Sequence, residues 1–268
     1  MYRFALRPLW LLGHLLAAAL VVLMVSLGFW QLSRLDERKE HNALVAKRSE
    51  TVVPLPVEGW ANKAKAANLS FRRVRLSGRY EPAKEVLVRF RSNQGLPGYH
   101  VLTPMATSGG TIIVNRGWVP LAMGNSWPNP GSRPPDGDTA ITGLLRSSEP
   151  ARRFSPDGPR AGAPLSVGAV NIAGLERRLS TPLYPLYLEL APPKPGATPA
   201  SYPEALPAPK LDEGPHLAYA AQWFLFAGGA AAGWVLLLRI SARKRRLTDV
   251  QEEPLGGSPS ATVEPQGR

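Results

Sequence analysis

The chain has 268 residues, with 32 Lys and Arg against 20 Asp and Glu, so its formal net charge is +12. This length allows one folded domain together with membrane segments. Much of the positive charge flanks apolar runs and no nucleic-acid motif accompanies it, which argues against a nucleic-acid partner. The absence of cysteine excludes disulfides, iron–sulfur clusters and thiolate zinc sites, and the four histidines show no metal-binding spacing.

The first long apolar run extends from Leu9 to Trp30 and contains no charged residue. As a helix that rises ~1.5 Å per residue it reaches ~33 Å, which is enough to cross a bilayer. No small-residue cleavage motif stands at its outer end, so the sequence predicts a retained signal anchor rather than a cleaved signal peptide. We therefore expect a short N-terminus at residues 1–8 and a first transmembrane helix at residues 9–32.

His14 lies inside this run, and an ionisable residue within a membrane span is by default a candidate functional residue. We favour the alternative, in which a neutral imidazole is hydrogen-bonded to a neighbouring helix. Gly13 and Ala17 form a small-xxx-small pair, as do Gly229 and Gly233 in the second apolar run. Two such faces would let the helices approach closely, and small residues that merely face lipid are an equally good explanation.

Residues 33–70 are expected to form a helical connector beyond the first span. The segment from Leu32 to Arg48 is rich in charge and favours a continuation of the first helix, which Pro54 and Pro56 would end. From Phe71 the hydrophobic pattern changes to a period of two, so the connector ends there.

Residues 71–190 have the pattern of a β-rich domain. Apolar and polar residues alternate, as in half-buried strands, and Gly- and Pro-containing turns separate the runs. We expect strands at residues 73–80, 85–90, 99–105, 111–115, 139–146 and 184–190, and a short helix at residues 172–179. Because closure handles exposed edge strands, a mainly antiparallel, barrel-like sheet fits this pattern.

The stretch from Asn115 to Pro120 ends one of these strands and holds Arg116 and Trp118. Arg beside Trp, with Gly117 permitting close approach, would suit a recognition corner. The alternative is a structural corner in which Arg116 bonds loop carbonyls, and the residues leave this choice open. His100 is out of phase with its apolar neighbours, so we expect it to be solvated or structural.

A Pro-rich connector at residues 191–215 leads to the second apolar run. In that run, 22 residues after His216 carry no charge, and we expect the second transmembrane helix at residues 216–238. The fold class is therefore an α+β membrane protein in which two transmembrane helices flank a mainly antiparallel, barrel-like domain.

The orientation follows from the basic residues beside the second span. Five of them lie between Arg239 and Arg246, so the positive-inside rule predicts a cytoplasmic C-terminus. With two spans, both termini are cytoplasmic and the β-rich domain is extracytoplasmic, in a multi-pass protein of the plasma membrane. Residues 239–268 then form a basic cytoplasmic tail, which is expected to be disordered from Thr248 onward.

His216 stands at the mouth of the second span, with Tyr219, Gln222 and Trp223 in its first two turns. A neutral imidazole here would serve as an axial ligand to haem iron, with the aromatic residues facing the porphyrin. The alternative is a histidine in an interfacial aromatic belt with no ligand. Gln222 needs a hydrogen-bond partner in lipid, either from the first span or from another membrane protein.

The residues needed for catalysis are not assembled in the sequence. There is no G-x-S-x-G motif, no cysteine nucleophile and no Gly-rich phosphate loop before a helix. Paired carboxylates such as Asp136/Asp138 and Glu81/Glu85 are better explained by turns. We expect no enzymatic activity and no catalytic residue, so a membrane-tethered enzyme is the least supported hypothesis.

Five motifs follow one another along the chain. They are Gly28-Phe29-Trp30-Gln31-x-x-Arg34; Val74-x-x-x-Gly78-x-Tyr80 followed by Glu85; Gly98-Tyr99-His100-Val101-Leu102-Thr103-Pro104; Val114-Asn115-Arg116-Gly117-Trp118-Val119-Pro120; and His216-Leu217-x-Tyr219-Ala220-x-Gln222-Trp223. In this order they resemble the surfeit-locus-1 family of cytochrome c oxidase assembly factors. They cover most of residues 9–240, and the Asn-Arg-Gly-Trp-Val-Pro and His-Leu-x-Tyr blocks together are quite specific.

The resemblance implies two spans around an extracytoplasmic domain, and a non-catalytic role in assembling the catalytic subunit of a haem-copper oxidase. Some bacterial members are similar to haem a carriers in which the histidine of the His-Leu-x-Tyr block takes part. The expected cofactor is therefore haem a, held transiently. The residues expected to bind it are His216 on the iron, with Tyr219, Gln222 and Trp223 shaping the site.

The partners that the resemblance implies are the oxidase catalytic subunit and haem a synthase. Arg116 and Trp118 are expected to contact the oxidase or the haem propionates, and Trp30 and Gln31 are expected to contact a partner. The alternative function is a haem-free membrane scaffold that stabilises an oxidase assembly intermediate through its two helices.

Overall fold

The computed structural model describes residues 3–61, 66–124, 126–129, 131–151, 165–192 and 202–251. The chain divides into two compact units, which we describe separately. The helical unit comprises the part up to Glu40 and the part from Glu213 onward, and the β-rich unit comprises His41–Asp212.

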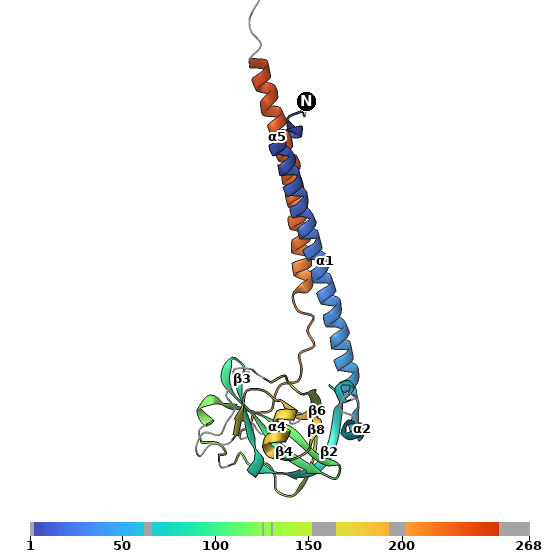
Figure 1. Ribbon diagram of the computed structural model, residues 1–268, viewed down its shortest axis with the longest axis vertical. Helices are drawn as coiled ribbons and strands as arrows, with labels where there is room; N and C mark the ends of the chain where they lie inside the picture. The colour runs from blue at the N-terminus through green and yellow to red at the C-terminus, as the bar shows by residue number, and fades with distance from the viewer. Residues whose placement is uncertain are drawn as a thin grey trace, which may run out of the picture. The chain divides into compact units, whose positions relative to one another are not determined.

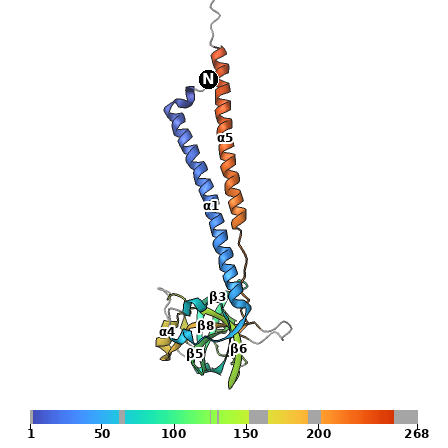
Figure 2. The ribbon, with the colours of Figure 1, turned by 90° about the vertical axis from the view of Figure 1, so that its right-hand side faces the viewer.

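The helical unit consists of α5 (His216–Gln251) and the part of α1 (Pro8–Glu50) up to Glu40. The short 3-10 helix η1 (Arg3–Leu6) precedes α1. The two long helices run side by side in opposite directions (Figures 1 and 2). Each contains a segment that is long and apolar enough to cross a membrane. The predicted pair of membrane helices is therefore confirmed as part of the fold.

Helix α1 continues well beyond its apolar segment, as the sequence predicts for residues 32–48. It ends at Glu50, shortly before Pro54, whose residue type cannot continue a helix. Helix α5 also outruns its apolar segment and ends at Gln251, so the expected disorder from Thr248 does not hold for its first residues. The rest of that tail lies outside the described residues, as do residues 193–201 of the Pro-rich connector.

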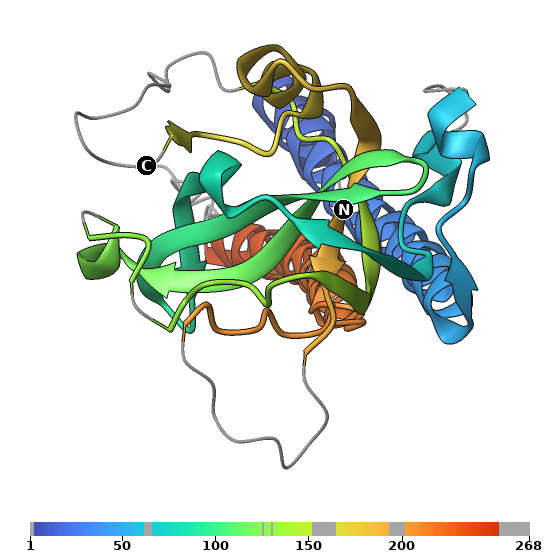
Figure 3. The ribbon, with the colours of Figure 1, turned by 90° about the horizontal axis from the view of Figure 1, so that it is seen from below.

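In its described residues, the β-rich unit contains eight strands and several short helices, drawn from below in Figure 3. Its strands are β1 (Val52–Pro54), β2 (Arg73–Tyr80), β3 (Val86–Asn93), β4 (Leu96–Thr107), β5 (Gly110–Pro120), β6 (Asp138–Ser147), β7 (Leu165–Val167) and β8 (Leu183–Leu190). Its helices are α2 (Glu58–Ala61), η2 (Ala67–Leu69), η3 (Pro82–Lys84), η4 (Leu121–Met123) and α4 (Ile172–Leu179).

The strands form one sheet in the order β1-β2-β6-β8-β5-β4-β3-β7, and β2 also pairs with β4. That last pairing, Arg79 with Ala106 and Tyr80 with Met105, closes a barrel of β2, β6, β8, β5 and β4. Five of the pairings are antiparallel, which confirms the predicted class. The pairings β1–β2, β3–β7 and β5–β8 are parallel, and the sequence did not predict them.

The barrel core follows from the alternation in its strands. In β2, every second residue from Val74 to Tyr80 is buried and the intervening ones are exposed. These side chains pack with apolar residues of the other barrel strands, since removing them from water is the main favourable term in folding. The central members of this cluster are Val74, Leu76, Met105, Ile112, Val114, Leu145, Tyr184, Leu186 and Leu188.

Strand β5 is longer than predicted, because the chain stays extended through the Arg-Gly-Trp sequence to Pro120. Gly117 makes this possible. Its φ is +137°, and a Cβ there would lie 2.1 Å from the carbonyl oxygen of Glu204. The neighbouring Trp118 exchanges two backbone hydrogen bonds of 2.8 Å with Glu204, which ties the Pro-rich connector to the barrel.

Candidate functional site

His216 is the first residue of α5. The preceding Gly214 has φ +68°, and the carbonyl of Pro215 accepts the hydrogen bond from the amide of Tyr219, so the helix begins at this point. The half-buried imidazole reaches α1, where its Nδ1 lies 2.9 Å from Oε1 of Gln31. An amide oxygen only accepts hydrogen bonds, so this contact suits the neutral tautomer with hydrogen on Nδ1, in which the lone pair of Nε2 is free.

Aromatic packing supports this pair deeper in the two helices. The ring of Phe224 lies against Gly28, where a Cβ would come within 2.6 Å of it. The same ring meets Phe29 edge-on, with 5.4 Å between the centroids. A small residue at position 28 therefore lets α5 pack closely beside the turn that carries Gln31.

A second polar contact joins the other ends of the two helices. The indole Nε1 of Trp234 donates to Nδ1 of His14 at 2.9 Å, and the same indole covers Gly13. This confirms the interpretation of His14 as an imidazole bonded to the neighbouring helix. The suggestion that the Gly13 and Gly229/Gly233 faces pack on each other is wrong, because nothing lies within 4 Å of a Cβ at Gly229 or Gly233 and an indole ring covers Gly13.

The other residues predicted to bind the cofactor lie on α5 near His216. Tyr219 and Trp223 follow it by three and seven residues and share its helix face. Tyr219 is 48% exposed, and Trp223 is half-buried against the ring of Phe226. Gln222 lies on another face, is exposed, and makes no hydrogen bond within the part of the chain that the structure describes.

Arg116 and Trp118 are interior residues of the β-rich unit. Nη1 of Arg116 donates to Oε2 of Glu85 at 2.9 Å, and Nη2 donates to the carbonyl of Ser132 at 2.6 Å. Trp118 is only 2% exposed. The structural-corner interpretation fits these contacts, while contact with a partner stays a prediction. Trp30 is 54% exposed and has a surface available to a partner.

Glu85 closes the 3-10 turn η3, as its predicted place in a turn requires, but its side chain has a further role that was not predicted. Its carboxylate accepts hydrogen bonds from Thr103 Oγ1, Arg116 Nη1 and Trp127 Nε1, so it anchors the loop after β5 to the barrel. Arg116 also lies 5.9 Å from the ring of Tyr80. Burial raises the pKa of Tyr80 to about 12, against the opposing effect of the Arg116 charge.

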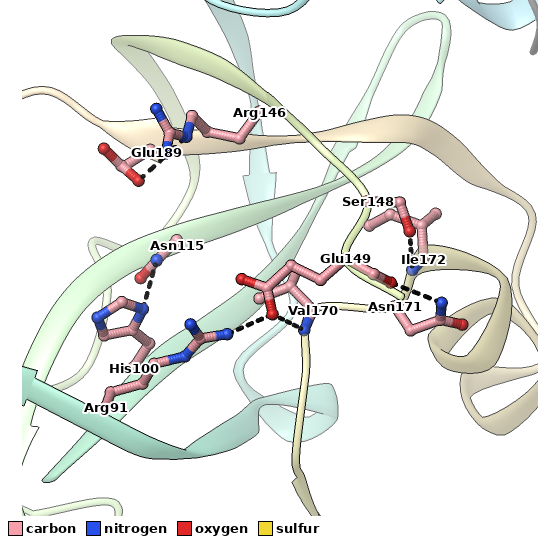
Figure 4. Close-up of polar contacts among 10 residues, drawn as sticks. All are labelled: Arg91, His100, Asn115, Arg146, Ser148, Glu149, Val170, Asn171, Ile172 and Glu189. Atoms are coloured by element: carbon pink, nitrogen blue, oxygen red, sulfur yellow. Dashed lines mark hydrogen bonds and ion pairs between the residues drawn. The ribbon is translucent and has the colours of Figure 1, made fainter. Parts of the chain in front are cut away.

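A second polar network surrounds His100, as Figure 4 shows. Nδ1 of His100 faces the side-chain amide of Asn115 at 3.2 Å. Burial, assisted by the positive charge of Arg91, lowers the pKa of His100 to about 4. Burial also acts to raise the pKa of Glu149, but hydrogen bonds from Arg91 and the Val170 amide outweigh it and hold that pKa below its usual value. His100 is thus structural, as expected.

A cavity of about 240 Å³ in the β-rich unit is lined mainly by apolar side chains and by prolines of the connector. Val45, Leu144 and Leu206 are among its walls. None of the predicted site residues lines it. Within the described residues there is also no group of three or more His, Asp or Glu that would hold a metal ion.

The amino-acid sequence matches one protein family over most of its length. The model of the SURF1 family matches residues 18–228, which include both Gln31 and His216. The chain belongs to the SURF1 family.

Among its SURF1 relatives is a SURF1-like protein of Mycobacterium tuberculosis, 32% identical over 90% of this chain and 89% of that protein. A SURF1-like protein of Monosiga brevicollis is 29% identical over 81% of this chain and 84% of its own length. Surfeit locus protein 1 of Mus musculus is 29% identical, over 49% of this chain and 47% of its own.

In this SURF1 protein, the feature that sequence reasoning missed is the pairing of Gln31 with His216. Gln31 was assigned to a partner surface, a role that stays a prediction. The two residues are 185 positions apart, so no local pattern joins them. The sequence offered one indication of the pairing. Gln31 belongs to the motif at the end of the first predicted span, and His216 belongs to the motif at the start of the second.

Proposed function

We propose that this protein is an assembly factor for cytochrome c oxidase that transiently holds haem a at the His216 end of its membrane helices. The observation that carries this proposal is the position of the His216 imidazole, whose Nδ1 lies 2.9 Å from the amide oxygen of Gln31. In the neutral tautomer that donates from Nδ1, the lone pair of Nε2 is available to a metal. Membership of the SURF1 family supports the assembly role.

The residues around His216 fit a haem group. One neutral imidazole nitrogen is the usual protein ligand to haem iron, and a single histidine is sufficient for it. Tyr219 and Trp223, on the same helix face, would offer aromatic surface to the macrocycle. When bound, the haem would supply the redox-active iron that the oxidase needs, while the protein's own part is to hold, orient and release it.

The proposed orientation is that of the positive-inside rule, with both termini cytoplasmic and the β-rich unit extracytoplasmic in the plasma membrane. Arg239, Arg243 and Lys244 at the far end of α5 support it. His216 then lies at the outer membrane face. Proposed partners are the oxidase catalytic subunit, which receives the haem, and haem a synthase, which provides it. We propose no catalytic activity for the protein itself.

A haem-free scaffold is the second candidate. The observation that favours it is Gln222, an exposed amide in a membrane helix that finds no hydrogen-bond partner in the described part of the chain. Hydrogen bonding between membrane helices is a recognised source of association, so a helix of the oxidase would satisfy this amide. In this case, Gln222→Leu would reduce co-purification of oxidase and His216→Ala would not.

The deciding experiment is an absorption spectrum of the purified protein after co-expression with haem a synthase. The wild type should carry the bands of protein-bound haem a, and His216→Ala should lose them at an unchanged protein level. His41→Ala is the matched control, because His41 lies outside the apolar segments, where its ring contacts Phe71. Full haem content in His216→Ala would overturn the ligand role.

A further inference from the structure

We propose that Gln31 is a positioning residue for His216, which holds the imidazole in the tautomer that has hydrogen on Nδ1 and a lone pair on Nε2. The tautomer is a property of the protein alone. Its consequence for iron rests on the proposed function, because the Nε2 lone pair is then presented to a metal.

The hydrogen bond itself carries the inference. Oε1 of Gln31 lies 2.9 Å from Nδ1 of His216, which is a normal distance for an N–H···O bond. A neutral imidazole has one protonated and one unprotonated nitrogen, and the hydrogen bond to one of them decides which is which. With an amide oxygen at Nδ1, the proton stays on Nδ1.

Two further contacts keep Gln31 opposite His216. Gly28, one turn earlier on the same face of α1, lies under the ring of Phe224. At the far end of the pair, His14 accepts from Trp234. His14 and Gln31 are 17 residues apart on α1 and Trp234 and His216 are 18 apart on α5, which is ~26 Å in both helices. The two helices are therefore held in one register by contacts at both ends.

The hydrogen bond from Nδ1 to Gln31 would affect how strongly His216 binds a metal. A histidine that binds a metal through one nitrogen usually donates its other N–H to an oxygen, which fixes the orientation of the ring and raises its basicity. Loss of such a partner typically weakens metal affinity 10–100-fold. Gln31 is in the position of this partner, although it contacts no metal itself.

A purely structural role, in which Gln31 only joins the two helices, makes a different prediction. It requires a hydrogen bond but no particular tautomer, and any variant that keeps the helices together would leave the ligand properties of His216 unchanged. The tautomer of His216 therefore separates the two roles.

The first test uses nitrogen NMR of the full-length protein, without haem, labelled with ¹⁵N-histidine. Only four histidines contribute signals, and the His216→Ala variant identifies the one of interest. At alkaline pH, wild type and Gln31→Glu should show a protonated Nδ1 and an unprotonated Nε2, and Gln31→Leu should lose this preference. His41→Ala, which removes a ring that lies outside the apolar segments against Phe71, is the control and should leave the His216 signals as in the wild type. A protonated Nε2 in the wild type, or no change in Gln31→Leu, would overturn the proposal.

The second test uses haem a titrated into the same variants. Gln31→Leu should bind it 10–100-fold more weakly than the wild type. Gln31→Glu should restore binding and lower the reduction potential of the bound haem, because a carboxylate gives the ring more imidazolate character and stabilises ferric iron. Unaltered affinity in Gln31→Leu would refute a positioning role toward iron. If His216→Ala binds haem normally, the proposed function fails, and the NMR result still decides whether Gln31 sets the tautomer.

Discussion

The buried charges of the β-rich unit show how single residues stabilise this fold. The side chains of Glu85 and Arg116 are only 7% and 9% exposed, and each has further hydrogen bonds to neighbours. A pair of this kind gives little net stability relative to apolar residues, but loss of one partner leaves an uncompensated buried charge. Its role here is to attach the loop after β5 to the barrel.

We predict that Glu85→Ala lowers the free energy of unfolding by about 3–5 kcal/mol, because Arg116 loses its counter-charge inside the unit. Thermal unfolding of the full-length protein in detergent measures this. Arg79→Ala is the control, since the Arg79–Asp138 pair is exposed and 3.8 Å apart, and its loss should cost less than about 1 kcal/mol. Equal melting temperatures for the two variants would contradict the role given to Glu85.

The lowered pKa of His100 leads us to predict that the stability of the protein depends on pH. Its pKa is lowered to about 4, so between the ordinary histidine value of 6.5 and about 4 the unfolded chain binds a proton that the folded chain does not. Stability should therefore fall as the pH decreases through this window, by at most about 3 kcal/mol, and should not respond to His100 above it. Melting curves across this range test the effect, and His100→Gln, which keeps an acceptor for Asn115, should flatten them. A wild type that is equally stable at both ends of the window would contradict the assignment.

At the scale of elements, the sequence predicted those helices and strands whose bounds depend on neighbouring residues alone. Strand β2 and helix α4 have the predicted bounds, because strict alternation marks the first and because Asn171, which accepts from the amide of Gly174, caps the second. The parallel pairing of β5 with β8 was not predicted, since it depends on contacts about seventy residues apart in sequence, as Ile113 with Tyr187 shows. The extension of β5 was missed because the stretch from Asn115 to Pro120 was taken as a corner at the end of the strand, whereas the positive φ of Gly117 lets the strand continue.

The pairing of α1 with α5 gives a prediction at this scale. Gly28→Leu should destabilise the helical unit by about 1–3 kcal/mol, because its side chain would collide with the ring of Phe224. Gly229→Leu should leave that stability unchanged, since nothing lies within 4 Å of the added Cβ. Melting of both variants in detergent makes the comparison. A larger loss in Gly229→Leu than in Gly28→Leu would show that the helices pack through a different face.

At the scale of the whole molecule, the chain joins a barrel to two membrane helices. The ends of the β-rich unit meet, because the side-chain amide of Asn42 donates to the carbonyl of Asp212 at 2.9 Å. The sequence predicted both helices and the barrel, since length and alternation are strong signals. It singled out His216 as a candidate site residue from its place at the start of a span, but its contact with Gln31 emerged only from the pairing of the two helices.

The central claim, that His216 ligates haem a, is tested most directly by the haem content of the full-length protein. The protein should be purified after co-expression with haem a synthase, and the molar ratio of haem a to protein compared between the wild type, His216→Ala and His41→Ala. We predict that the wild type and His41→Ala retain haem and that His216→Ala retains none above background. An equal ratio in all three proteins would contradict the claim.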